Sequence, residues 1–213
     1  MAIKPILFNT EMVRAILEGR KSCTRRIVKP QQLIGMLPDK CKNGAPEKFL
    51  KEKKLMFKPY CDMTDIELIN TAYKASYQPG DILYVRETWS EGYEEGTYIY
   101  RASDKLAGLP TFKESSKLIY HPSIHMPKEA ARIWLKIMNV RVERLQDITS
   151  EQIYREGVEV EYPHVLNGEE KRYAFSTLWD STIKKADLDR YGWDANPWVF
   201  VYEFERCKKP EGV

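Results

Sequence analysis

Residues 10–30 carry the strongest local signal in the chain, a short helix followed directly by a cluster of cations. The helix is amphipathic, because four apolar side chains recur at the spacing of one helical face: Met12, Val13, Ile16 and Leu17. Asn9 or Thr10 can cap its start, and Gly19 is placed to end it in a left-handed conformation. We therefore expect the chain to turn sharply at Gly19.

The segment after Gly19 combines cations and hydroxyls within seven positions: Arg20, Lys21, Ser22, Thr24, Arg25 and Arg26. The simplest interpretation is a solvated basic turn, which is what most runs of charge are. The alternative is a reactive site. Neighbouring guanidinium groups favour the neutral form of Lys21, and a neutral lysine can accept a proton from Thr24. The local pattern alone leaves both interpretations open.

Length and composition indicate one soluble domain over residues 1–213, with a single core that carries insertions. The net charge of +3 is too small to establish a nucleic-acid partner. The four cysteines lack the spacing of a zinc site or a disulfide framework, so we expect no metal and no cofactor. The chain shows no signal peptide and no membrane-spanning run, and we expect it in the cytoplasm without a membrane partner.

The pattern of apolar residues predicts five or six strands interleaved with short helices. Strands are expected at residues 4–8, 24–28, 82–89, 97–102, 133–145 and 198–204, and a helix at residues 175–185. The strand at 133–145 should be bent or bulged near Asn139. Residues 31–78 are interpreted as an insertion, and residues 103–127 as a loop-rich segment. The absence of a βαβ rhythm indicates an α+β fold, a small mixed β-barrel with flanking helices.

A second helix has unusually clear boundaries. Thr149 is a candidate N-cap, Gln152 completes a capping box, and Gly157 can end the helix. Glu156 then lies in the last turn, where the negative end of the helix dipole favours a protonated carboxyl group. Such a group suits general acid–base chemistry, although exposed glutamates also occupy this position routinely.

Three segments resemble the ASCH family of PUA-like β-barrels: GRKSCTRR after the first helix, GDILYVRETW in mid-chain, and ITSEQIYREG at the second capped helix. The segments PSIHMP and YGWDANPWVFVYEFER resemble the long ASCH proteins common in phages and prophages. The resemblance covers most of the chain, and residues 31–78 and 91–121 depart from the compact members. It implies a PUA-like barrel with inserted loops.

The resemblance also implies an activity. Compact bacterial members are amidohydrolases that remove the acetyl group from N4-acetylcytidine, and their catalytic lysine, threonine and glutamate match Lys21, Thr24 and Glu156. A further arginine of the family matches Arg26. In this interpretation Thr24 attacks the amide carbonyl, Lys21 accepts its proton, and Glu156 protonates the departing amine. The substrate would be an N4-acylated cytosine in a nucleoside, a nucleotide or a nucleic acid.

The alternative function is a non-catalytic module that binds RNA, or less readily DNA, or a modified base. Tyr84 and Trp89 could then stack on a base, while Arg20, Arg25 and Arg26 contact phosphate. Ordinary packing in the barrel core would also explain both aromatic residues, and for Trp89 the two interpretations are about equal. A nuclease is disfavoured because the sequence has no recognisable acidic metal cluster.

Overall fold

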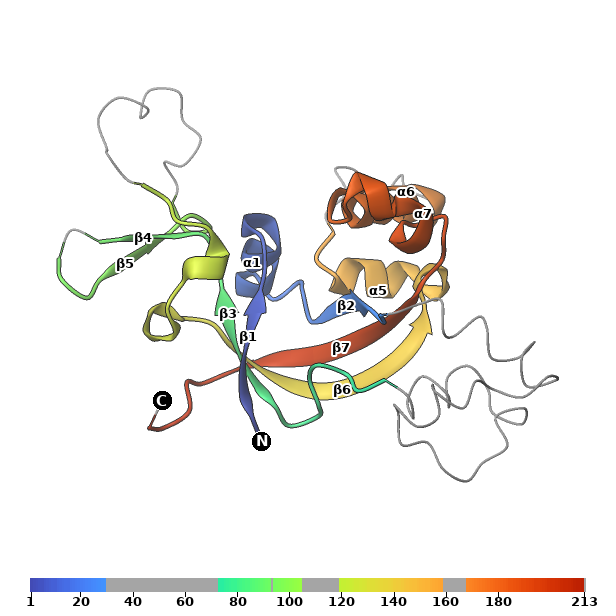
Figure 1. The fold of residues 1–213 in the computed structure, drawn as a ribbon. Helices are drawn as coiled ribbons and strands as arrows, with labels where there is room; N and C mark the ends of the chain where they lie inside the picture. The colour runs from blue at the N-terminus through green and yellow to red at the C-terminus, as the bar shows by residue number, and fades with distance from the viewer. Residues whose placement is uncertain (30–72, 93, 105–118, 159–167, 213) are drawn as a thin grey trace.

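The computed structural model describes residues 1–29, 73–92, 94–104, 119–158 and 168–212. Its main sheet has five strands in the order β1-β3-β6-β7-β2 (Figure 1). The strands are β1 (Ile3–Leu7), β2 (Cys23–Ile27), β3 (Ile82–Arg86), β6 (Trp134–Arg144) and β7 (Trp198–Cys207). β1 and β3 are parallel, and the other neighbours are antiparallel. A separate hairpin pairs β4 (Trp89–Glu91) with β5 (Tyr98–Tyr100).

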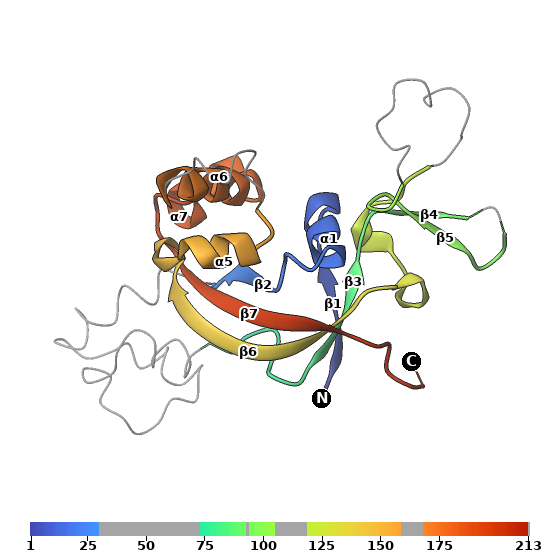
Figure 2. The same cartoon turned by 180° about the vertical axis from the view of Figure 1, so that it is seen from behind.

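The helices lie on one side of the long curve formed by β6 and β7, as the two opposite views show (Figures 1 and 2). They are α1 (Thr10–Leu17), α5 (Ser150–Arg155), α6 (Gly168–Ser181) and α7 (Leu188–Tyr191). Four short 3-10 turns complete the described elements: η4 (Ser123–His125), η5 (Lys128–Ala130), η6 (Leu145–Asp147) and η7 (Lys185–Asp187). The predicted α+β architecture is confirmed.

The strands β1 and β2 are the edges of the main sheet. Among the described residues, β1 pairs only with β3 and β2 pairs only with β7, so the ladders form an open, curved sheet. A side chain spans the gap between the edges, because the Arg26 guanidinium donates to the Leu7 carbonyl at 3.1 Å. The closure of a barrel therefore stays a prediction.

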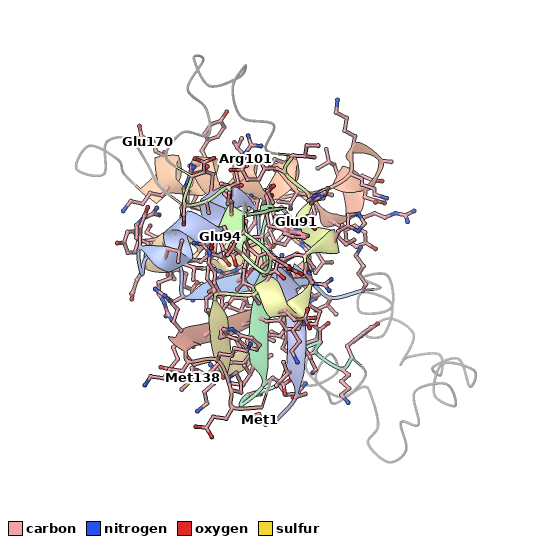
Figure 3. All side chains as sticks on the ribbon, turned by 90° about the vertical axis from the view of Figure 1, so that its left-hand side faces the viewer. Met1, Glu91, Glu94, Arg101, Met138 and Glu170 are labelled. Carbon is pink, nitrogen blue, oxygen red and sulfur yellow. The ribbon has the colours of Figure 1, made fainter. Side chains whose placement is uncertain are left out.

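The bulge predicted near Asn139 is confirmed. The β6–β7 register shifts between Ile137 and Asn139, which oppose Phe204 and Glu203. The skipped residue, Met138, is 49% exposed and lies at the end of the sheet far from the helices (Figure 3). An extra residue in one strand increases local twist, and this helps a strand of eleven residues to curve.

β7 lies between two hydrophobic clusters, which explains its nearly continuous apolar sequence. Alternate side chains of a strand point to opposite faces. One face of β7 joins α1, β1 and β3 in a cluster that includes Trp198, Phe200, Tyr202 and Phe204. The other face packs Val199 and Val201 against the side chains of α5 and α6. A third cluster, at the base of the β4–β5 hairpin, contains Tyr84, Trp89, Met126 and Trp134.

The boundaries of the C-terminal helices differ from those expected. α6 begins at Gly168 and ends at Ser181, whereas the sequence pattern predicted a helix over 175–185. Glu169 and Glu170 favour the earlier start because acidic residues are stabilising in a first turn. α7 occupies the beginning of the turn-rich segment 189–197.

Two segments singled out in the sequence fall largely outside the described residues. These are residues 31–72 of the expected insertion at 31–78 and residues 105–118 of the loop-rich segment at 103–127. Of the latter segment, residues 103, 104 and 119–127 are described: His121 bridges to Trp89, and η4 follows soon after.

Gly157 allows α5 to end close against α1. It has a φ of +84°, and a Cβ atom there would lie 2.7 Å from the Ala15 Cβ and 3.1 Å from the Lys21 Cβ. Gly19 has a similar φ of +79° but no atom within 4 Å of its ideal Cβ. The two glycines thus share a backbone conformation and differ in the space around them.

We expect Gly157→Ala to destabilise the protein more than Gly19→Ala. The left-handed conformation should cost each variant about 1–2 kcal/mol, and forced contact with α1 should add about 1–3 kcal/mol for Gly157→Ala only. Urea unfolding at 25 °C measures both values. Equal losses would show that the contact between α5 and α1 relaxes freely.

The Asp81 carboxylate links the start of β1 to the start of β3 through hydrogen bonds. Its carboxylate accepts hydrogen bonds from the Ala2 N–H at 2.9 Å, the Lys4 Nζ at 2.7 Å and the Gln78 N–H at 3.0 Å. Burial opposes ionisation of this carboxyl group, but the hydrogen bonds outweigh burial and lower its pKa to about 2. The ionised form is therefore favoured by folding.

Since the folded pKa of Asp81 lies below its ordinary value of 3.8, its contribution to stability is present above about pH 4 and is lost as the pH falls towards 2. Asp81→Asn should lower the free energy of unfolding at pH 7, and the difference from the wild type should shrink in that window. Urea titrations from pH 7 to pH 2 measure it, with the exposed Asp147 as a matched Asn control. A difference that is constant with pH would contradict this assignment.

Candidate active site

Lys21 is fixed by the turn that follows α1. Gly19 ends the helix, and the main-chain N–H groups of Arg20 and Lys21 both donate to the Ala15 carbonyl, at 2.9 and 3.0 Å. This arrangement directs the chain from the helix into β2. The Lys21 side chain is fully buried, with an exposed fraction of 0%. The interpretation as a solvated turn therefore does not hold for Lys21.

Glu156 is fixed by the end of α5. Thr149 and Gln152 form the predicted capping box at the start of this short helix, and Glu156 is its C-cap. Gly157 then lets the chain leave in a left-handed conformation. The position of Glu156 thus follows from local signals at both ends of one helix.

The Glu156 carboxylate is shared between two buried cations. Lys21 Nζ donates to Glu156 Oε2 at 2.7 Å and also to the Glu156 main-chain carbonyl at 2.7 Å. Arg25 Nη1 donates to Glu156 Oε1 at 2.9 Å. The exposed fractions of the Arg25 and Glu156 side chains are 1% and 6%. Each carboxylate oxygen therefore has a cation of its own, which a buried carboxylate requires.

Arg25 is in turn held by two further acceptors. Its Nε donates to Glu143 at 3.1 Å, and its Nη2 donates to Glu143 and to the Gln152 side-chain oxygen, the latter at 3.0 Å. Burial favours loss of the charge, but the carboxylates of Glu156 and Glu143 outweigh it and raise the pKa of Arg25. The sequence pattern pointed to Gln152 only as part of the capping box and gave no role to Glu143. The alternation of Arg141 with Glu143 along one strand face was the available signal for Glu143.

The ion pairs continue towards the surface. Arg141 donates to Glu143 at 3.0 Å and also pairs with Glu203. Glu203 lies 3.8 Å from Arg155, whose Nε donates to the Ser22 hydroxyl at 3.0 Å. Charges of alternating sign thus connect β2, β6, β7 and α5. This network fixes the positions of Arg25 and Glu156 from several directions.

A pocket of about 210 Å³ lies beside these groups. Thr24, Arg25, Arg26 and Glu156 form its polar part. The remaining wall comes from α1, the end of β2, and α6 with the residues after it: Met12, Ile27, Phe175, Leu178, Trp179, Thr182 and Ile183. In Figure 1 these elements lie above the curve of β6 and β7, with α1 and α6 to either side of β2.

The Thr24 hydroxyl is available for chemistry. Its side chain is buried and lines the pocket, and no hydrogen bond to it is found among the described residues. The neighbouring Cys23 is not an alternative nucleophile. Burial raises the pKa of its thiol to about 12, and the Glu156 carboxylate adds to this rise, so the thiolate is scarce at neutral pH.

The structure brings together five of the predicted site residues, namely Lys21, Thr24, Arg25, Arg26 and Glu156. Arg20 lies just outside, where its side chain donates to Glu18 at 2.8 Å and to the Gly157 carbonyl at 3.1 Å. Tyr84 and Trp89 do not line this pocket. They belong to the cluster beneath the β4–β5 hairpin, where Tyr84 packs on Trp134 and Trp89 packs on Tyr98 and His121.

The aromatic residues that do line the pocket are Phe175 and Trp179 of α6. The sequence pattern predicted a helix over residues 175–185 but gave Trp179 no role in a site. Trp179 Nε1 donates to the Tyr191 carbonyl at 2.8 Å, which fixes the indole against the pocket. A core-facing aromatic residue on a helix gives no local sign that the core ends there in a cavity.

In the part of the chain that the structure describes, no group of three or more acidic, histidine or cysteine side chains has the arrangement of a metal site. Within the same residues, no helix has both the length and the apolar character needed to cross a membrane.

No protein-family model matches the chain, and a search of curated proteins gives no match. Among solved structures, the chain is similar to the ASCH domain from Lactobacillus crispatus JV V101, with 9% sequence identity and a TM-score of 0.39, covering 96% of this chain and 79% of that one. It is also similar to the hypothetical protein PH0355, with 14% identity and a TM-score of 0.33, covering 97% and 100% of the two chains. Both TM-scores lie below 0.5.

Arg25 and Arg26 provide a matched test of the buried ion pairs. Arg25→Met should cost about 3–5 kcal/mol of stability, because two carboxylates lose their shared partner in a buried place. Arg26 is only partly buried and donates to one carbonyl, so Arg26→Met should cost about 1 kcal/mol. Denaturant unfolding of both variants measures the difference, and similar losses would contradict the central place given to Arg25.

Proposed function

We propose that this chain is a metal-independent amidohydrolase that removes the acyl group from an N4-acylated cytosine. The observation that carries the proposal is a threonine hydroxyl without a described hydrogen-bond partner, in the same pocket as a carboxylate bonded to a buried lysine. The substrate class comes from the resemblance of GRKSCTRR to the ASCH amidohydrolases. Membership of the ASCH family, a closed PUA-like barrel and a likeness to the phage-type members are part of the same proposal.

The Lys21–Glu156 pair supports the assigned roles through its shared proton. The hydrogen bond of 2.7 Å joins an ammonium to a carboxylate. Transfer of one proton along it gives a neutral amine and a protonated carboxyl group, without any change in total charge. The amine can then accept the Thr24 proton, and the carboxyl group can protonate the leaving nitrogen. Arg25 opposes this transfer because its charge stabilises the carboxylate.

The reaction then proceeds through an acyl-enzyme. A bond forms between Thr24 Oγ and the acyl carbon, and the bond from that carbon to the exocyclic nitrogen breaks as the nitrogen takes its proton from Glu156. Water subsequently attacks the ester and releases a carboxylic acid, which restores the threonine hydroxyl. Burial of the site strengthens each of these charge interactions relative to water.

The composition of the pocket also suits such a substrate. A volume of about 210 Å³ is small for a ligand site and matches a single base with a short acyl group better than a folded polymer. Trp179 and Leu178 offer apolar surface to the ring, and Arg26 offers a cation at the polar side. A nucleic acid, RNA in preference to DNA, could present its base as a flipped or unpaired residue.

One observation favours the alternative, a binding module for RNA or a modified base. Both oxygens of Glu156 already accept hydrogen bonds from cations, and such a satisfied network can serve to hold a pocket open without reacting. In that case the ligand would bind and leave unchanged. Turnover distinguishes the two functions directly.

Incubation with N4-acetylcytidine, followed by chromatography for released cytidine, tests the proposal. Thr24→Val should abolish release, with a loss of at least about a thousandfold, because valine keeps the shape of threonine and removes the nucleophile. Thr24→Ser should retain part of the activity. Thr182→Val is the matched control, since Thr182 lines the same pocket but donates its hydroxyl hydrogen to the Trp179 carbonyl at 2.7 Å.

Wild-type binding of N4-acetylcytidine without release of cytidine would establish the binding module instead. Release that persists in Thr24→Val would remove threonine from the mechanism. Circular dichroism of each variant establishes that the fold is intact, so that a loss of activity can be assigned to the hydroxyl.

A further inference from the structure

The hydrogen-bond pattern of β2 follows from two bonds at its ends. The Val28 N–H donates to the Trp198 carbonyl at 3.0 Å, and the Phe204 N–H donates to the Ser22 carbonyl at 2.9 Å. Both pairs continue the antiparallel register of β2 with β7. In an antiparallel ladder, hydrogen-bonded and non-hydrogen-bonded pairs alternate. The main-chain groups of Thr24 and Arg26 therefore point to β7, and those of Arg25 and Ile27 point away from it.

The opposite side of β7 gives the same result independently. The Leu145 N–H donates to the Pro197 carbonyl at 3.0 Å, in continuation of the β6–β7 register. The odd-numbered residues of this part of β7 thus bond to β6, and the even-numbered residues remain for β2. The even-numbered residues oppose Thr24 and Arg26, since Tyr202 pairs with Thr24 and Phe200 pairs with Arg26.

The outward main-chain groups of Arg25 and Ile27 lie along the pocket. All four residues from Thr24 to Ile27 line it, although their side chains alternate between the two faces of the strand. A pocket that touches both faces of a strand runs along its edge. Among the described residues, no hydrogen bond to the outward N–H or C=O groups of Arg25 and Ile27 is found.

We propose that this free edge of β2 recognises the polar edge of a pyrimidine base through main-chain hydrogen bonds from Arg25 and Ile27. The inference rests on the proposed function, since it assigns the recognition half of the same site. The edge presents donor and acceptor groups in alternation: N–H and C=O of Arg25, then N–H and C=O of Ile27. A cytosine acylated at N4 carries an amide N–H beside a ring nitrogen acceptor, which is a complementary pattern.

Arg25 thereby contributes to the site in two separate ways. Its guanidinium is occupied by Glu156, Glu143 and Gln152, and is not available to a ligand. Its outward main-chain N–H and C=O groups, in contrast, need hydrogen-bond partners once a ligand excludes water from the pocket. A bound base would supply those partners. Thr24, the residue before Arg25, then lies at one end of the bound edge.

The size of the site favours a base over an added peptide strand. A peptide that extends a sheet needs a long open edge. Among the described residues that line this pocket of about 210 Å³, Arg25 and Ile27 alone present outward main-chain groups of β2, and Met12 and Trp179 form part of the apolar wall. A planar ring can pack against such a wall, and its edge needs only a few hydrogen bonds.

Amide hydrogen exchange of the assigned protein tests the proposal. In the free protein, the Arg25 and Ile27 N–H groups should exchange at least about tenfold faster than those of Thr24 and Arg26, which are bonded in the ladder. Cytidine or N4-acetylcytidine at millimolar concentration should slow exchange at Arg25 or Ile27, and ribose should not. Slow exchange of all four amides in the free protein would overturn the proposal, as would an absence of protection by both pyrimidines.

Replacement of the Arg26–Ile27 amide by an ester provides a second measurement. The isoleucine side chain is kept while the outward N–H is lost, and binding of the pyrimidine should weaken roughly three- to tenfold. The same change at Val28 is the matched control, since that N–H belongs to the ladder: it should lower stability and leave affinity unchanged. Equal affinities of the Ile27 ester and the wild type would count against recognition through the Ile27 N–H.

The proposed recognition edge and the proposed hydrolase activity can be refuted independently. Protection of Arg25 or Ile27 by cytidine, without release of cytidine from N4-acetylcytidine, would support the recognition edge and refute the hydrolase activity. Release of cytidine without protection at Arg25 or Ile27 would support the hydrolase activity and show that the base is recognised elsewhere.

Discussion

The shared carboxylate of Glu156 ties the end of α5 to the turn after α1 and to β2, which lie more than 130 positions earlier in the sequence. Lys21 comes from the turn after α1, Arg25 from β2, and Glu156 from the end of α5. An ionised carboxylate is costly to bury, and the cost is offset only where each oxygen has a good partner. Three local features place those partners. The turn at Gly19 fixes Lys21, the left-handed conformation of Gly157 lets α5 end against α1, and Glu143 orients Arg25. The positions of α1, β2 and α5 are thus coupled through the Glu156 carboxylate.

The same constraint separates the polar and apolar halves of the pocket. Charged groups gather at the edge strand β2, because there the ion-pair network can reach the surface through Arg141 and Glu203. Apolar residues of α6 form the facing wall and exclude water. Charges act more strongly in such a place than in solvent, and fixed dipoles need no rearrangement when a ligand binds. A small pocket can therefore combine shape selection with strong polar contacts.

Local signals predicted the elements well, because caps and alternation act within a few residues. The capping box of Thr149 and Gln152, the bend near Asn139 and the end of α1 at Gly19 are all present. The proximity of Lys21 and Glu156 could be expected only by combining a helix-end argument with a family resemblance, since 135 positions separate them. The pocket wall could not be predicted. Inward aromatic residues such as Trp179 and Trp89 give the same pattern whether they face a cavity or a filled core, and only packing decides between the two.

Gln152 gives the site a property that neither its ion pairs nor its pocket suggests. Its side-chain oxygen accepts from the Thr149 N–H at 3.0 Å, which closes the capping box, and from Arg25 at 3.0 Å. One atom therefore belongs both to the first turn of α5 and to the charged cluster. Fraying of that turn would withdraw an acceptor from Arg25, and loss of Arg25 would loosen the turn. We therefore expect the start of this six-residue helix and the charge cluster to open and close together.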